Sequence, residues 1–426
     1  MENLKKLQIK WSQEGNIVYL HIKEEKFYFE APNGYNIYEV DESTKELALF
    51  HLLWYMGFFE KQGSYEQPSH IHKNITRTIS GKNIGLSYSN GCDSAATLLC
   101  LPPEKTIPIY CCGDFSKKSS LNIIKKTKRL CNFPDFINQK YYDYNYNALK
   151  FMQQAKIKNL QIIRNDFELI RPYIMNDGTT KIGFGPGIGY GAILILLSKF
   201  FDIGYITFGA ISESVFLGTG HRFIDIIDKH RPGESLIIRW KRIYKAYGFE
   251  LFYALGGCSE IITSNIIKNS IFKNTACSCN TRILSDKNYC GDCMKCFRNF
   301  GMNGQMIPYN KKWGWWLYKF PLKMATSTLY ACQKINYTNE FIEQYMHLDM
   351  SYLERYYTPY LEKEDDNQIA LVPDAFRDYI QNKLKDYGIE PMNENDIKNF
   401  KNCGDYFNND KYNNLKIKKN TDVKNN

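Results

Sequence analysis

The sequence has no long run of apolar residues. Its most apolar region, residues 190–210, is interrupted by Lys199 and Asp202 and is too short to span a bilayer. The first eight residues carry charged and polar side chains where a secretory signal has its apolar segment. We therefore expect a soluble cytoplasmic protein that has no membrane partner.

Internal repeats and an excess of acidic residues are also absent. Lysine and arginine total 55 against 45 aspartate and glutamate residues, which gives a formal net charge of +10. A basic chain attracts phosphate-bearing partners such as RNA, but solvated surface lysines explain the same excess. The 426 residues are 44% hydrophobic and 23% charged, which is typical of globular proteins, and they suffice for two or three domains.

Thirteen cysteines in a chain without a secretory signal favour reduced thiols and metal ligands over a disulfide framework. Four of them form two overlapping C-x-x-C steps with one further cysteine upstream: Cys279, Cys290, Cys293 and Cys296. A C-x-x-C turn brings two thiolates to one ion at about 2.3 Å, and Gly291 permits the tight backbone that the turn requires. The spacing predicts a tetrahedral Zn²⁺ site with no open position, which braces the fold and takes no part in chemistry.

Apolar periodicity predicts an α/β fold. Residues 6–40 alternate apolar and polar side chains between turn residues, which is typical of an antiparallel β meander, and an apolar helix is expected over 46–60. Strands are then expected at residues 84–87, 106–111, 160–164 and 204–208, and helices at 94–101, 116–130 and 190–201. Repeated alternation of strands and helices implies a doubly wound parallel sheet that is covered on both faces.

This pattern divides the chain into five expected parts. An N-terminal β extension with a helix precedes the α/β region, and a cysteine-rich segment follows it. A mostly helical region and a disordered tail, rich in asparagine and lysine, complete the chain. The expected boundaries are 1–78, 79–270, 271–305, 306–398 and 399–426.

A short polar motif, Ser89-Asn-Gly-Cys-Asp-Ser94, follows the first strand of the α/β region and opens a helix. Free backbone N–H groups and the helix dipole at such a junction favour anions, and Gly91 lets the backbone approach a phosphate. The Ser94 hydroxyl can donate to phosphate, and Asp93 can hold a Mg²⁺ ion. A plain helix N-cap uses the same residue types, but the position on the first strand favours nucleotide binding. The residues expected to surround the nucleotide are Ser87, Ser89, Asn90, Gly91, Cys92, Asp93 and Ser94.

The pattern Ser-x-Gly-x-Asp-Ser resembles the PP-loop signature of the ATP pyrophosphatase superfamily, usually written Ser-Gly-Gly-x-Asp-Ser. The resemblance implies a HUP-like PP-loop fold that binds ATP and Mg²⁺, cleaves ATP to AMP and pyrophosphate, and adenylates a substrate. Asp93 and Ser94 would then be the catalytic residues. Asn90 departs from the family, which most often has glycine there, and its side chain would crowd the phosphates or reshape the loop.

Within that superfamily, the cysteine cluster resembles the C-terminal zinc motif of the 7-cyano-7-deazaguanine synthases. That motif reads Ser-Cys…Cys-Gly-x-Cys-x-x-Cys…Arg. This chain has Ser278-Cys279, then Cys290-Gly-Asp-Cys293-Met-Lys-Cys296, then Arg298. A similar arrangement, with an N-terminal extension before the PP-loop, occurs in the ATP-dependent glutamate epimerase of UDP-muramoyl dipeptide. The resemblance covers roughly residues 80–300.

Two further loops are candidate substrate contacts. The glycine-rich loop that contains Gly187 and Gly189 precedes an apolar helix, so it forms either a second backbone cradle or a flexible connection. Glu213, His221 and Arg222 follow the last of these predicted strands, where a doubly wound sheet faces its ligand. A carboxylate there suits magnesium or an amine, and the basic side chains suit phosphate or carboxylate. A polar surface loop is the plain alternative.

Together these features predict a ligase-type enzyme that uses ATP to adenylate a carboxylate or similar oxygen of a small molecule. The activated group would then give an amide or nitrile, or allow epimerisation. A second hypothesis is a PP-loop enzyme that modifies tRNA, which the basic charge supports. A third is a non-catalytic, zinc-containing nucleotide-binding module, which Asn90 supports. The sequence does not indicate the oligomeric state.

Overall fold

The structure is a computed structural model, and it describes most of the chain. The described residues are 6–56, 58–62, 65–68, 77–131, 148–175, 182–184, 189–215, 236–276, 279, 289–309, 311–318, 325–358 and 371–399. The chain folds into two compact units. Unit 1 comprises Met1–Ser89, Pro103–Thr207 and Trp240–Leu251, and unit 2 comprises Asn90–Pro102, Phe208–Arg239 and Phe252–Asn426. None of the described helices has the length and apolar character needed to cross a membrane.

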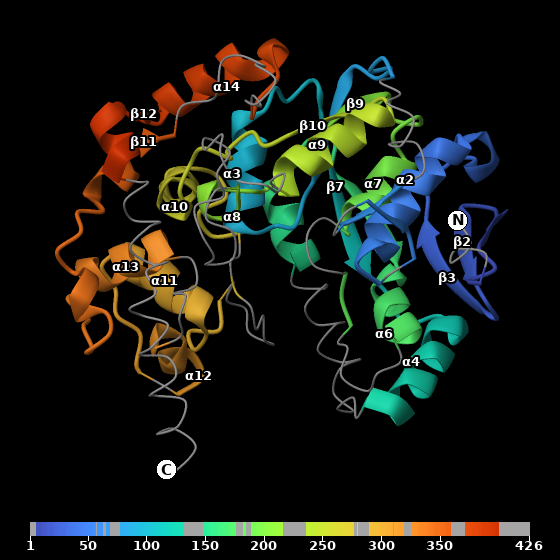
Figure 1. Ribbon diagram of the computed structural model, residues 1–426, viewed down its shortest axis with the longest axis horizontal. Coiled ribbons are helices and arrows are strands. Elements are labelled where there is room, and N and C mark those ends of the chain that lie inside the picture. Colours follow the sequence, from blue (N-terminus) through green and yellow to red (C-terminus); the bar gives the residue numbers. More distant parts are fainter. Residues whose placement is uncertain are drawn as a thin grey trace. The chain divides into compact units, whose positions relative to one another are not determined.

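Unit 1 carries nearly all of an eight-stranded sheet with the strand order β1-β2-β3-β8-β7-β6-β9-β10 (Figure 1). The strands are β1 (Lys10–Glu14), β2 (Ile17–Ile22), β3 (Glu25–Glu30), β6 (Asn83–Ser87), β7 (Thr106–Gly113), β8 (Gln161–Asn165), β9 (Ile203–Phe208) and β10 (Glu250–Phe252). The prediction of a mixed α/β fold is thereby confirmed.

The first three strands form the predicted antiparallel meander. Along β2 every second side chain, Val18, Leu20 and Ile22, is fully buried, which is the period expected of a strand with one face on a core. Beyond the prediction, β3 pairs antiparallel with β8 through Phe29 and Asn165. The meander therefore continues the main sheet.

The middle of the sheet is parallel: β7 pairs with β6 on one side and with β8 on the other. Strand β6 is almost entirely buried, as expected for a strand covered on both faces. Helix α7 (Gly191–Leu196) is fully buried and contacts both β6 and α2 (Glu42–Leu53) (Figure 1). A β-carbon on Gly85 would lie 2.9 Å from Leu194 Cδ2, so this glycine permits the close approach of helix and strand.

A buried carboxyl group ties the meander to the parallel strands. Asp166, directly after β8, accepts hydrogen bonds from the Tyr28 N–H (2.6 Å) and from Ser120 Oγ on α4 (Lys118–Cys131; 2.7 Å). Burial raises the pKa of Asp166 to about 7. The unfolded chain therefore loses this proton near pH 4, whereas the folded chain keeps it until about pH 7.

Asp166→Asn is expected to stabilise the protein only at higher pH. The amide oxygen accepts the Tyr28 N–H and the amide nitrogen donates to Ser120 Oγ, so both contacts are kept by a group that does not ionise. The variant therefore escapes the loss of stability that the wild type suffers between pH 4 and pH 7. We expect equal free energies of unfolding near pH 4 and a gain of up to about 4 kcal/mol at pH 8. Urea unfolding at pH 4, 6 and 8 measures this difference, and a gap that is independent of pH would contradict the assignment.

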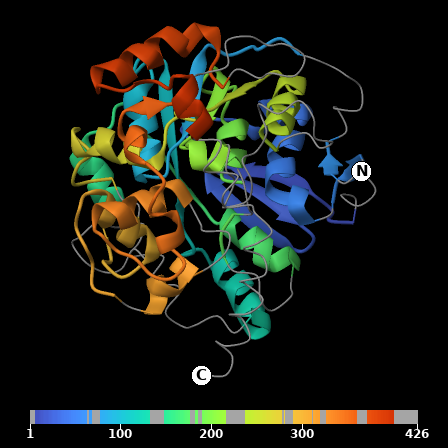
Figure 2. The same cartoon turned by 60° about the vertical axis from the view of Figure 1, so that its left-hand side comes forward.

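Unit 2 is mainly helical in its described part. Its longer helices are α3 (Cys92–Cys100), α10 (Glu260–Lys268), α11 (Met294–Met302), α13 (Ala325–Lys334) and α14 (Asp374–Asp386). Helix α3 contacts α10 and α14. Helix α11, gold in Figure 2, packs along α13, which is orange. A β-carbon on Gly301 of α11 would lie 2.8 Å from the Ala331 methyl group, so glycine is required for this close packing.

Several predicted boundaries shift. The helix expected over 46–60 is α2, which begins at Glu42, ends at Leu53 and is followed by a short 3-10 turn. The helix expected over 190–201 ends at Leu196, because the chain then turns back: the Ile203 N–H bonds to the Ser198 carbonyl, and Asp202 adopts a φ of +52°. The tail beyond residue 399 lies outside the described residues.

Candidate metal centre and nucleotide loop

The four cysteines predicted as zinc ligands come together in unit 2. Their sulfur atoms all lie within 4.8 Å of one another, and Cys279, Cys293 and Cys296 are buried while Cys290 is half-buried. The Cys279–Cys293 and Cys290–Cys296 sulfur pairs are 3.9 and 3.7 Å apart. A tetrahedron with Zn–S bonds of about 2.3 Å has edges of about 3.8 Å. The cluster therefore fits a zinc ion that has four thiolate ligands.

Local backbone geometry positions the sulfurs. Gly291 has a φ of +76°, which glycine adopts without strain, and the turn directs the Asp292 N–H to Cys290 Sγ at 3.4 Å. Cys293 is the N-cap of α11, and Cys296 lies in its first turn. One residue after Cys296, the Phe297 ring stacks on buried Trp313 with centroids 4.5 Å apart, which anchors α11 in the core. The tryptophan is a packing residue.

The nucleotide loop has one residue in the left-handed region. Asn90 has a φ of +57° and is fully buried, and its Nδ2 donates to the Thr275 carbonyl oxygen at 3.1 Å. Asparagine tolerates this conformation better than most residues, and glycine adopts it freely. Asn90 therefore preserves a backbone shape that glycine would also give, and its side chain is directed at the segment that leads from α10 to the cysteines.

Variants at this position separate backbone conformation from side-chain bonding. Asn90→Gly keeps the left-handed conformation but loses the hydrogen bond to Thr275. We therefore expect the free energy of unfolding to fall by about 1 kcal/mol. Asn90→Asp places a carboxylate against the Thr275 carbonyl oxygen in a buried site. We expect this to lower the free energy of unfolding by about 3 kcal/mol or more. Thermal and urea unfolding measure both costs. Stability equal to that of the wild type in both variants would show that the amide donor is not what holds the loop.

Asp93 lies half-buried in the first turn of α3, where a negative charge suits the helix dipole. Thr263 of α10 donates to Asp93 Oδ1 at 2.7 Å, which fixes the orientation of the carboxyl group. Burial, and next the charge of Glu260, raise the pKa of Asp93 to about 7, whereas Lys295 opposes the shift. This environment favours the protonated carboxyl group over the bare carboxylate.

Ser94 is buried in the same turn. Its hydroxyl donates to the Gly91 carbonyl at 3.1 Å, so the side chain caps the loop in this structure. Gly209, which follows β9, lies against this turn: a β-carbon there would be 2.6 Å from Ser94 N. The first turn of α3 thus depends on a glycine distant in sequence.

Glu213, at the start of α8 (Ser212–Val215), is fully buried and tightly bonded. Its carboxylate accepts from Ser212 Oγ, Thr326 Oγ1, Ser327 Oγ and the Glu260 N–H. Burial, followed by the charge of Glu260, raises its pKa. The carboxylate thereby joins α8, α10 and the start of α13 inside unit 2.

A buried ion pair joins this acidic group to the metal-bearing helix. Arg298 of α11 bonds to Glu260 Oε1 at 3.0 Å, and both side chains are at most 5% exposed. Among the described residues, Glu260 Oε2 and Arg298 Nε have no hydrogen-bond partner. Arg298 lies two residues after Cys296, the last cysteine of the cluster, and Glu260 is the first residue of α10. The ion pair therefore ties α11 to the N-terminus of α10.

Replacing only one side chain of this ion pair is expected to lower the free energy of unfolding more than replacing both. Glu260→Gln leaves the Arg298 charge buried without an opposite charge, and we expect a loss of about 3–5 kcal/mol. Adding Arg298→Met to that variant removes the stranded charge and should restore part of the loss. A double-mutant cycle by urea unfolding checks this. Strictly additive costs would show that the two side chains do not interact.

The other predicted site residues are distributed differently. Ser87 ends β6, and Ser89 is exposed beyond it, both in unit 1. Gly189 is buried just before α7, where its carbonyl accepts the Ala192 N–H at 3.2 Å. Gly187, His221 and Arg222 lie outside the described residues.

Four residues of this region were not predicted as site residues: Gly209, Glu260, Thr263 and Arg298. Only Arg298 had a sequence signal, since it ends the cysteine motif. The others are set by helix packing within unit 2, which a local pattern does not encode.

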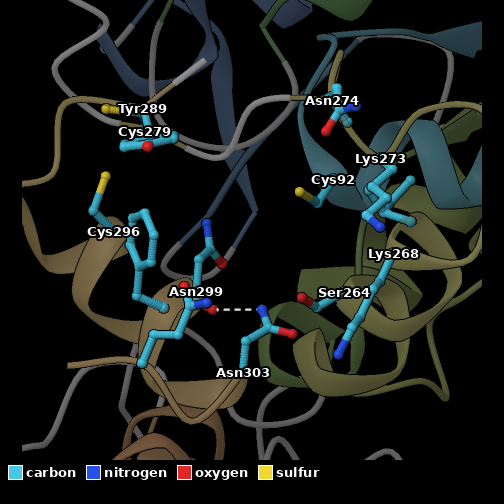
Figure 3. Close-up of a pocket in the computed structure, with 14 residues that line it drawn as sticks. Cys92, Ser264, Lys268, Lys273, Asn274, Cys279, Tyr289, Cys296, Asn299 and Asn303 are labelled. Atoms are coloured by element: carbon cyan, nitrogen blue, oxygen red, sulfur yellow. Dashed lines mark hydrogen bonds between the residues drawn. The ribbon is translucent and has the colours of Figure 1, made fainter. Parts of the chain in front are cut away.

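Unit 2 also contains a cavity of about 500 Å³ beside the cysteine cluster (Figure 3). One wall carries Cys92 of the loop with Ser264 and Lys268 of α10. The other carries Cys279 and Cys296 of the cluster. The volume is in the range of small-molecule sites.

Comparisons with known proteins give one finding. A family model described as "Family of unknown function (DUF6395)" matches residues 239–404. The match includes α10, the cysteine cluster and α14, but not the loop at 89–94. No curated protein and no solved structure matches the chain.

Proposed function

We propose that this protein is a PP-loop enzyme of the ATP pyrophosphatase type, with a doubly wound α/β fold, that cleaves ATP to AMP and pyrophosphate and adenylates a carboxylate or similar oxygen of a small molecule. The observation that carries the proposal is the first turn of α3. There the motif's aspartate, Asp93, is held by Thr263 next to backbone shaped by Asn90. That is the arrangement an aspartate needs to present a carboxylate beside bound phosphates.

The residues have separate tasks in the proposed reaction. An acceptor oxygen attacks the α-phosphorus of ATP, the bond from that phosphorus to the bridging oxygen breaks, and pyrophosphate leaves with the electron pair. Backbone N–H groups at Gly91–Ser94 hold the phosphates, and the Ser94 hydroxyl contributes a further contact once it turns from Gly91. Asp93 would hold Mg²⁺, which neutralises the leaving pyrophosphate. The protein contributes positioning and charge, without a covalent nucleophile.

The proposed zinc ion has a structural task. A four-thiolate site has no open position for substrate, so it supplies no Lewis acid to the reaction. It fixes the start of α11 and with it Arg298, which neutralises Glu260 on α10. The same α10 presents Thr263 to Asp93, so the metal supports the loop through packed helices.

The test is release of AMP and pyrophosphate from ATP and Mg²⁺ while candidate acceptors are added singly. The panel contains small carboxylates, including 7-carboxy-7-deazaguanine and UDP-muramoyl peptides, and transfer RNA. We expect release that depends on a single small carboxylate. Release that depends only on RNA would replace the proposal by tRNA modification, and ATP binding without release in any mixture would support a non-catalytic module.

A further inference from the structure

The cavity beside the cysteine cluster is lined by fourteen residues, all in unit 2. They include Cys92 of the loop as well as two of the proposed zinc ligands, so the cavity lies between the two motifs that sequence reasoning singled out. Figure 3 shows Lys268, Lys273 and Cys92 on one wall and Cys279 and Cys296 on the facing wall.

The positive charge of this lining lies on one wall, whereas the four thiolates of the proposed zinc cluster would give the facing wall a net negative charge. Lys268 and Lys273 are its only ionisable nitrogen groups, and none of the fourteen residues is an aspartate or glutamate. Among the described residues, neither lysine side chain forms an ion pair or hydrogen bond, and both residues are exposed. The remaining polar lining is mostly amide, from residues such as Asn274 and Asn299. The wall that carries the two lysines is therefore the side of the cavity that attracts an anion.

We propose that this cavity binds the acceptor of the reaction, and that the acceptor is a small organic dianion whose second anionic group, a carboxylate or phosphate, is held by Lys268 and Lys273. This inference rests on the proposed function and specifies its substrate class. The need for a second group follows from charge. A carboxylate loses its negative charge when it becomes an acyl adenylate, so lysines that hold the acceptor through the reaction require another anionic group.

The amide side chains and the cluster complete the site. Asn303 Nδ2 donates to the Asn299 backbone carbonyl at 2.8 Å, which holds the end of α11 at the cavity edge. Because Cys279 and Cys296 line the facing wall, zinc binding sets the width of the cavity as well as the position of α11. The acceptor site should therefore require the metal.

Cys92 supplies a reporter that needs neither ATP nor a known substrate. Iodoacetate is a carboxylate and iodoacetamide is its neutral counterpart, and both alkylate a thiolate with loss of iodide. Peptide mass spectrometry on zinc-loaded protein gives the initial rate of each reagent at Cys92. A change in the reactivity or exposure of the thiol affects both rates alike, so it cancels in their ratio. We expect Lys268→Ala with Lys273→Ala to lower that ratio about fivefold, from two charges lost at roughly 8 Å in water.

Lys385→Ala is the matched control, because it removes an exposed lysine of unit 2 that lies outside the cavity lining. It should leave the ratio unchanged, and circular dichroism should show all variants folded. An unchanged ratio in the double lysine variant would overturn the anion site.

The dianion is tested by protection. Succinate and succinamate have nearly the same size, but succinate carries a second negative charge. At constant ionic strength, succinate should slow labelling of Cys92 by iodoacetamide at about a tenfold lower concentration than succinamate, and the double lysine variant should lose this difference. Equal potency in the wild type would exclude the second anionic group.

These results separate from those on the proposed function, because no ATP is present. If Cys92 shows anion selectivity but the protein never cleaves ATP, the anion site in the cavity is supported and the adenylation reaction is contradicted. If the double lysine variant releases AMP as the wild type does at every acceptor concentration, the adenylation reaction is supported and the role of the cavity as the acceptor site is contradicted.

Discussion

Cys296→Ser is expected to abolish tight zinc binding and to unfold the cysteine-bearing part of unit 2. The four sulfurs are spaced for one tetrahedral ion, and loss of one thiolate removes one of its four bonds. Structural zinc sites contribute about 10–16 kcal/mol of apparent binding free energy in small peptides, more than any other single interaction considered for this chain. Metal analysis should give one zinc per chain for the wild type and almost none for the variant.

Cys332→Ala provides the control. Cys332 is also buried in unit 2, on α13, but it lies outside the cluster. This variant should keep one zinc per chain and lose only the small stability cost of a shortened buried side chain. A chelator should lower the melting temperature of the wild type and of Cys332→Ala, but not that of Cys296→Ser. Wild-type protein that is folded without any bound metal, and unaffected by chelator, would contradict the structural role.

Asp93→Asn is expected to lower the rate of pyrophosphate release by about 10³-fold or more. The amide oxygen still accepts the Thr263 bond, so the loop keeps its shape, but the charge that would hold Mg²⁺ is lost. Binding of ATP without Mg²⁺ should change little, because backbone N–H groups supply most of the phosphate contacts. Steady-state kinetics with equilibrium binding of ATP separates the two effects.

Two variants calibrate this result. Thr263→Val keeps the Asp93 charge but removes the bond that orients it, so we expect a smaller loss of about tenfold. Glu213→Gln changes a carboxylate that is bonded within the protein, so it should affect stability more than turnover. Turnover that is equal in wild type and Asp93→Asn would remove Asp93 from the proposed reaction.

Much of the fold follows from short-range sequence signals. The strand at Asn83–Ser87 is a buried apolar run, and the helix after it is marked by Gly91 and Asp93, so both elements were predicted to within two residues. The cysteine cluster was predicted in full, because the C-x-x-C spacing by itself restricts where the sulfurs can go.

The long-range pairings were not predictable in this way. That β3 joins the sheet beside β8 depends on Asp166 reaching the Tyr28 N–H, a contact between residues far apart in the sequence. Similarly, no local pattern places Arg298 against Glu260, because each is a common residue on an amphipathic helix. Buried polar contacts of this kind are decided by how helices pack, and that information is spread over the whole of unit 2.

The identity of the products formed from ATP tests the proposed adenylation most directly. Purified zinc-loaded protein would be incubated with Mg²⁺, the acceptor panel and ATP labelled separately at the α and γ phosphates. Adenylation predicts that the α label appears in AMP or in an adenylated acceptor and the γ label in pyrophosphate, both absent with Asp93→Asn. Formation of ADP and inorganic phosphate, or failure of the protein to bind ATP at all, would contradict it.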